Sequence, residues 1–69
     1  MHSDIIKSER LLRMPEVVAH VGIGRSAIYQ GVKAGTFPKP VKISSQVSAW
    51  VGSEIDQWVH ERIAAGRQR

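Results

Sequence analysis

The chain has 69 residues and a formal net charge of +4, which leaves room for one domain with one small core. It contains no cysteine, so neither disulfide bonds nor thiolate zinc sites can support that core, and we expect a cytoplasmic protein. The N-terminal residues do not resemble a secretory signal, and no apolar segment approaches the ~20 residues needed to cross a bilayer. We therefore expect no membrane partner.

The charge is unevenly distributed along the chain. Residues 17–53 contain no acidic residue and four basic ones, Arg25, Lys33, Lys39 and Lys42. The two flanks hold six acidic and six basic residues, which cancel, so the central segment carries the whole excess. A positive field confined to one region is expected for a surface that contacts a phosphate backbone. A solvated basic face kept for solubility explains the charge equally well.

The first third of the chain predicts a leader, a short strand and a helix. Residues 1–9 show no periodicity and are expected to form a flexible leader. Residues 10–14 have two arginines flanking an apolar centre, which suits a short edge strand. The first helix is expected over residues 14–22, because Pro15 suits a first helical turn and Gly22 can end the helix in the left-handed conformation.

A glycine-containing turn and a second helix follow. Residues 22–24, Gly-Ile-Gly, permit a tight turn in which Ile23 packs between the helices. The second helix is predicted over residues 25–34 and divides into an apolar side and a polar side. The polar side consists of Arg25, Ser26, Tyr29, Gln30 and Lys33. It contains no carboxylate, whereas an ordinary solvent-facing side would usually include Glu or Asp.

The next segment predicts a rigid connector and a β-hairpin. Residues 36–40, Thr-Phe-Pro-Lys-Pro, are expected to be extended because each proline fixes φ and restricts the residue before it. Phe37 is expected to anchor this connector in the core. Residues 41–43 and 47–50 then predict two strands around a short polar tip at residues 44–46. This hairpin is the candidate wing.

The last helix is expected to begin with Ser53 as its N-cap and Asp56 in a variant of the capping box, and to end at Gly66. Residues 67–69 form a short basic tail, for which we favour no role. The apolar residues Ile55, Trp58, Val59 and Ile63 recur at helical spacing and are expected to pack on the hairpin and the first helix. We assign Trp50 and Trp58 to the core rather than to base stacking.

Four motifs stand in order along the chain: LLRMPEV at 11–17, GIGRSAIY at 22–29, GTFPKPVK at 35–42, and Trp50 followed by EIDQW at 54–58. This set resembles the AlpA family of phage regulatory proteins over residues 10–65. The resemblance implies a small, mainly α fold with a β-hairpin, a MerR-like winged helix-turn-helix domain also used by excisionases, which we place at residues 10–66. It further implies a transcription regulator of phage or mobile-element genes, or an excisionase that acts with an integrase.

Three features depart from the family pattern. Residues 44–46, Ser-Ser-Gln, stand where wings of the family commonly carry an arginine, and Gly24 stands where Ser or Thr usually caps the second helix. Gly31 replaces a larger residue inside that helix. Because an interior glycine costs ~1 kcal/mol relative to alanine, we expect a somewhat looser second helix.

We predict that the second helix enters the major groove of double-stranded DNA, which is ~12 Å wide and admits one helix, while the hairpin approaches the adjacent backbone or minor groove. Arg25 is expected to contact guanine or a phosphate, and Gln30 to contact adenine. The remaining contacts are expected to fall mainly on phosphates and to set the register. The full set of predicted DNA-binding residues is Arg25, Ser26, Tyr29, Gln30, Lys33, Lys39, Lys42, Ser44 and Ser45. A packing role for Tyr29 and ordinary solvation of the two later lysines are the alternatives.

Other classes of function are less well supported. His2, His20 and His60 lack the close spacing of a metal site, and no nucleophile has an evident base, so we expect no enzyme, metal or cofactor. The alternative of a different class is an interaction module that recruits an integrase or an RNA polymerase subunit. The carboxylate-free second helix argues against that as the sole role. Because one short helix gives limited specificity, we expect dimers or cooperative multimers on DNA.

Overall fold

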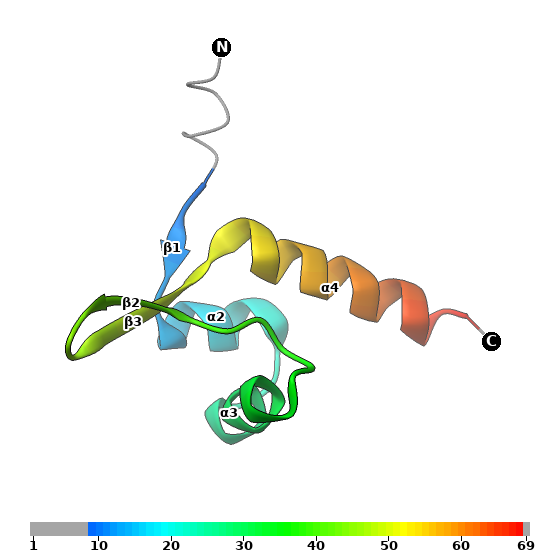
Figure 1. Ribbon diagram of the computed structural model, residues 1–69. Helices are drawn as coiled ribbons and strands as arrows, with labels where there is room; N and C mark the ends of the chain where they lie inside the picture. The colour runs from blue at the N-terminus through cyan, green and yellow to red at the C-terminus, as the bar shows by residue number, and fades with distance from the viewer. Residues whose placement is uncertain (1–8, 69) are drawn as a thin grey trace, which may run out of the picture.

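The computed structural model describes residues 9–68, which form three helices and a three-stranded sheet (Figure 1). In chain order the elements are β1 (Leu11–Leu12), α2 (Met14–Val21), α3 (Arg25–Ala34), β2 (Val41–Ser44), β3 (Val47–Val51) and α4 (Gly52–Gly66). The helix-turn-helix pair therefore precedes the hairpin, and the longest helix closes the fold. In Figure 1, α3 forms the bottom of the molecule, the hairpin projects to the left and α4 runs to the right.

The sheet is antiparallel with strand order β1-β3-β2. Leu12 lies opposite Trp50 in the pairing of β1 with β3, which confirms the predicted edge strand although it is shorter than expected. β2 and β3 form the predicted hairpin, with an irregular register between Lys42 and Ser44. Such irregularities bend a hairpin and increase its local twist.

The first helix of the helix-turn-helix pair, α2, begins and ends as the sequence predicts. Pro15 lies in the first turn of α2, and Gly22 ends the helix with φ 78° while its N–H donates to the Val18 carbonyl over 3.0 Å. The Glu16 carboxylate accepts a hydrogen bond from the Arg13 N–H at the helix start, also over 3.0 Å. This bond satisfies one of the donors that a helix N-terminus leaves without a partner.

The core takes one fully buried side chain from each helix, Val17, Ile28 and Ile55. Trp50 of the sheet and Phe37 of the connector complete its centre, with exposures of 2% and 5%. Burying a side chain of this size contributes roughly 1.5–3 kcal/mol, so this cluster fixes how the three helices and the hairpin are held together. The predicted fold, small and mainly α with a β-hairpin wing, is confirmed.

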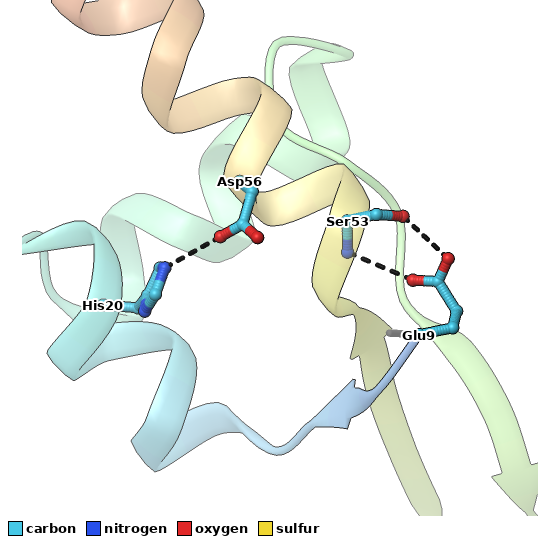
Figure 2. A network of polar contacts seen from close by, with 4 residues as sticks. All are labelled: Glu9, His20, Ser53 and Asp56. Carbon is cyan, nitrogen blue, oxygen red and sulfur yellow. Dashed lines mark hydrogen bonds and ion pairs between the residues drawn. The ribbon is translucent and has the colours of Figure 1, made fainter. Parts of the chain in front are cut away.

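The predicted start of the last helix is wrong by two residues. The N-cap of α4 is Val51, and Ser53 lies inside the first turn, where its N–H and Oγ donate to the two Glu9 carboxylate oxygens over 3.2 and 3.0 Å (Figure 2). Asp56 does not complete a capping box but accepts from His20 of α2 at 3.0 Å. Contacts with Glu9, which precedes β1, and with His20 of α2 therefore replace the local cap.

The last turns of α4 extend beyond the rest of the domain (Figure 1). Ile63, which we expected to pack in the core, is 45% exposed for this reason. The predicted leader falls almost wholly on residues 1–8, and the last residue of the predicted tail is residue 69; these lie outside the described residues, so the domain boundaries stay predictions. Within residues 9–68, no helix is long and apolar enough to span a membrane.

Candidate nucleic-acid interface

Helix α3 contacts the core through one side only. Ile28 is fully buried and Val32 is half-buried, and both lie on the apolar side predicted from the sequence. Gly35 ends the helix with φ 85°, at the position where the chain turns into the connector. Because the contact is confined to this side, the opposite side of α3 faces solvent.

The polar side of α3 presents Arg25, Ser26, Tyr29, Gln30 and Lys33, all of them exposed. Tyr29 is 55% exposed, so most of its ring is not used for packing. Among residues 9–68, these five side chains have no hydrogen-bond or ion-pair partner. The surface is therefore rich in donors that the described part of the fold does not use.

Two tryptophans hold the connector between α3 and the hairpin. The Trp50 Nε1–H donates to the Pro38 carbonyl, and the Trp58 Nε1–H donates to the Thr36 carbonyl, each over 2.9 Å. Phe37 packs against Trp58 edge to face, with ring centroids 4.9 Å apart. The connector is thus anchored to both the sheet and α4, which leaves the Lys39 side chain exposed between two fixed prolines.

Gly31 has a role in this anchoring that the sequence did not indicate. A Cβ at this position would lie 2.8 Å from the Phe37 Cβ. The Gly31 carbonyl also accepts from the backbone N–H groups of Thr36 and Phe37, over 2.8 and 3.1 Å. The absence of a side chain therefore lets the connector fold back tightly against the last turns of α3.

The wing tip carries a positive charge, although residues 44–46 at the tip are uncharged. The Lys42 Nζ donates to the Ser45 carbonyl over 3.2 Å, which places the ammonium group at the turn. The Ser44 Oγ accepts from the Gln46 N–H at 3.4 Å, so this hydroxyl supports the tip. Sequence reasoning placed Lys42 on a strand and missed that its side chain reaches the turn, because the contact depends on the bulged register of β2.

Two acidic residues of α4 lie on the side of the connector that faces α4. A cleft of about 630 Å³ between the connector and α4 is lined by Glu54 and Glu61, whose charges would repel a phosphate backbone. Gln57 donates to Glu61 over 3.1 Å in the same cleft. Residues 9–68 contain no group of three His, Cys, Asp or Glu side chains that could hold a metal ion. The surface formed by α3, the connector and the wing is therefore the candidate nucleic-acid interface.

Comparison with known proteins agrees with this architecture. The family model described as the prophage CP4-57 regulatory protein (AlpA) matches residues 10–63. The chain is 44% identical over 64 residues to the uncharacterized protein ORF88 of Enterobacteria phage P4, an overlap that covers 93% of this chain and 72% of the phage protein. It is 32% identical over 59 residues to the DNA-binding transcriptional activator AlpA of Escherichia coli K12, covering 77% of this chain and 84% of that protein. No solved structure matches the chain. The chain belongs to the AlpA family of prophage regulatory proteins.

Proposed function

We propose that this protein is a sequence-specific, double-stranded DNA-binding regulator of phage or mobile-element genes. In this proposal α3 enters the major groove and the β2–β3 hairpin acts as the wing. The observation that carries it is the polar side of α3, which is exposed, bears two cations and no carboxylate, and lacks partners among residues 9–68. The name of the E. coli relative, a DNA-binding transcriptional activator, supports the same class of function. A regulatory role of this kind requires no catalytic group.

The proposed contacts divide into base contacts and phosphate contacts. Arg25 at the start of α3 and Gln30, about one and a half turns later, carry side chains that match guanine and adenine edges in the major groove. Lys33, Lys39 and Lys42 are proposed to bind phosphates, which fixes register but carries no sequence information. Ser26, Tyr29, Ser44 and Ser45 are proposed to donate hydrogen bonds to phosphate oxygens.

The decisive experiment measures duplex binding as a function of salt for the wild type, Arg25→Ala and Lys33→Ala. A binding site is first selected from random duplexes, and its affinity is compared with that of a scrambled duplex. The wild type should bind more weakly as salt rises, with a log–log slope of about −0.9 per phosphate contacted. Arg25→Ala should lose ~1–3 kcal/mol of binding free energy on the selected site only, whereas Lys33→Ala should weaken binding to both duplexes equally.

The two variants control each other, because both remove one exposed cation from the same helix. Unchanged affinity of both variants for the selected site would exclude α3 as the contacting helix. Absence of any attraction between the wild type and duplex DNA at low salt would exclude the proposed function itself.

We further propose that the protein acts on DNA as a dimer or a cooperative multimer. A single short helix can contact only a few base pairs, which limits the discrimination available to one copy. Sedimentation with a selected site of increasing length would count the bound copies. A single copy bound at every length, without cooperativity, would contradict this stoichiometry.

A transcription regulator and an excision factor would use the same DNA-binding surface but different protein partners. The first would contact RNA polymerase, and the second an integrase. Transcription from the selected site and integrase-dependent excision, each assayed with and without this protein, would separate the two roles.

A further inference from the structure

A second cleft lies between the start of α2, the polar side of α3 and the hairpin. Its volume is about 240 Å³, several times the ~30 Å³ that one water molecule occupies in the liquid. Arg13, Tyr29, Gln46 and Ser48 contribute its polar lining, and Trp50 contributes to its apolar lining. Three segments that are distant in the sequence, together with Pro40 at the end of the connector, therefore meet around one polar depression beside the candidate interface.

The charge of this cleft is positive. Arg13 is the charged residue among those that line it, and no carboxylate does so. The nearest acidic group in the sequence, Glu16, is engaged by the Arg13 backbone N–H rather than by its guanidinium. Within residues 9–68, the Arg13 guanidinium has no ion-pair partner. An arginine, a tyrosine, a glutamine and a serine that line one cleft can together supply donors suited to phosphate oxygens.

The cleft lies where one sugar-phosphate strand of a bound duplex would be expected to pass. Each sugar-phosphate strand separates a major groove from the neighbouring minor groove. If α3 occupies the major groove and the wing approaches the adjacent minor groove, the strand between those grooves must pass between α3 and the wing. The cleft lies at that position, with Tyr29 on the α3 side and Gln46 and Ser48 on the hairpin side.

We propose that this cleft binds a backbone phosphate of the DNA and that Arg13 supplies the charge for that contact. The inference rests on the proposed function and extends it to a residue before the helix-turn-helix pair. In the sequence, Arg13 lies in the N-terminal flank, and the charges of the two flanks cancel. Its nearest residue of opposite charge is Glu16. Only the folded chain brings it beside Tyr29 and the hairpin.

The test combines a protein variant with a modified DNA. Duplexes carrying a single neutral methylphosphonate linkage at successive positions are bound by the wild type and by Arg13→Gln. The wild type should lose affinity at the linkage that faces the cleft. Arg13→Gln should bind unmodified duplexes roughly five- to tenfold more weakly than the wild type near 0.1 M salt, with a slope smaller by about 0.9. It should also be insensitive to the neutral linkage at that position, and it should keep its preference for the selected site.

Arg67→Gln is the matched control, because it removes the same charge from the end of α4, on the other side of the molecule from the hairpin (Figure 1). It should retain the wild-type slope and the full response to each neutral linkage. Arg13→Gln keeps the backbone N–H that donates to Glu16, and a thermal melt verifies that the variant folds. Arg13→Lys is a second variant, and it should restore most of the slope of affinity against salt. Wild-type affinity and slope in Arg13→Gln, or its continued sensitivity to every linkage that affects the wild type, would overturn the proposal. Failure of the wild type to bind any duplex would instead overturn the proposed function.

Discussion

Helices α3 and α4 use their polar residues in opposite ways. On α4, Asp56 accepts from His20, Glu61 accepts from Gln57, and Ser53 donates to Glu9. On α3, the corresponding exposed residues have no such partner among residues 9–68, and none of them is acidic. Ser53 and Asp56 of α4 therefore link parts of the domain to each other, whereas the polar residues of α3 remain available to a ligand outside it.

The difference also appears in how each helix is held. α4 is joined to its neighbours by hydrogen bonds at its first turns, to Glu9 at Ser53 and to Thr36 at Trp58. α3 is held by Ile28 and by the tight return of the connector over Gly31. Both helices bury an isoleucine in the core, but only α4 is also fixed through hydrogen bonds of its polar and aromatic side chains within residues 9–68. The polar side chains of α3 therefore do not hold the helix in place.

The largest expected effect comes from reversing one charge on each helix. Lys33→Glu on α3 should weaken duplex binding by at least roughly tenfold at moderate salt, because a contact with a phosphate becomes a repulsion. Arg67→Glu, which makes the same change in net charge at the end of α4, should alter binding only slightly. Fluorescence anisotropy with a labelled duplex measures both. Equal losses in the two variants would show that net charge, rather than the surface of α3, determines binding.

A smaller but still large effect is expected at Gly31. Helix propensity alone predicts that Gly31→Ala stabilises the protein by up to ~1 kcal/mol. The structure predicts the opposite sign, a loss of about 1–3 kcal/mol in the free energy of unfolding, because the new Cβ would lie 2.8 Å from the Phe37 Cβ. Urea denaturation followed by circular dichroism decides between these. A rise in stability would show that the connector can move away from α3 without cost.

Gly31 illustrates what the sequence could not provide. The periodicity of residues 25–34, the glycines at both ends and the prolines of the connector were sufficient to predict α3 and its polar side, since each signal is local. The need for glycine at position 31 arises from Phe37, which approaches only after the connector turns back. Helix propensity does not include such a contact, so the sequence predicts only that this glycine destabilises the helix.

The same limit applies at Ser53 and Lys42. Ser53 followed by Asp56 is a local pattern typical of a capped helix start, but Glu9 and His20 compete for these groups from 44 and 36 residues away. Lys42 was correctly assigned to a strand, yet its reach to the Ser45 carbonyl depends on the register of the hairpin. Elements and their exposed sides could be predicted from the sequence, whereas contacts between elements required the folded chain.

The bond between α4 and the connector should have a moderate effect on stability. Trp58→Phe removes the N–H donated to the Thr36 carbonyl and should cost about 0.5–1.5 kcal/mol. Trp50→Phe is the matched change from the sheet side; it should cost more, because Trp50 is only 2% exposed and its bond to Pro38 is partly buried. Thermal melts of the two variants test this order. The reverse order would mean that α4, not the sheet, is the main support of the connector.

The smallest expected effect is a gain in stability at the start of α3. Gly24 is the N-cap, with φ −80° and ψ 171°, and it supplies no side-chain bond to the helix. A Cβ at this position meets no atom within 4 Å, so serine can adopt the same backbone and accept a hydrogen bond from the first turn. Gly24→Ser should therefore raise the free energy of unfolding by roughly 0.5 kcal/mol, through the cap and through a less flexible unfolded chain. The same substitution at Gly22, where φ is 78°, should lower stability, because serine is strained in the left-handed region. A shift in the same direction for both variants would show that capping and backbone strain do not control this turn, and that α3 is held chiefly by Ile28 and the connector.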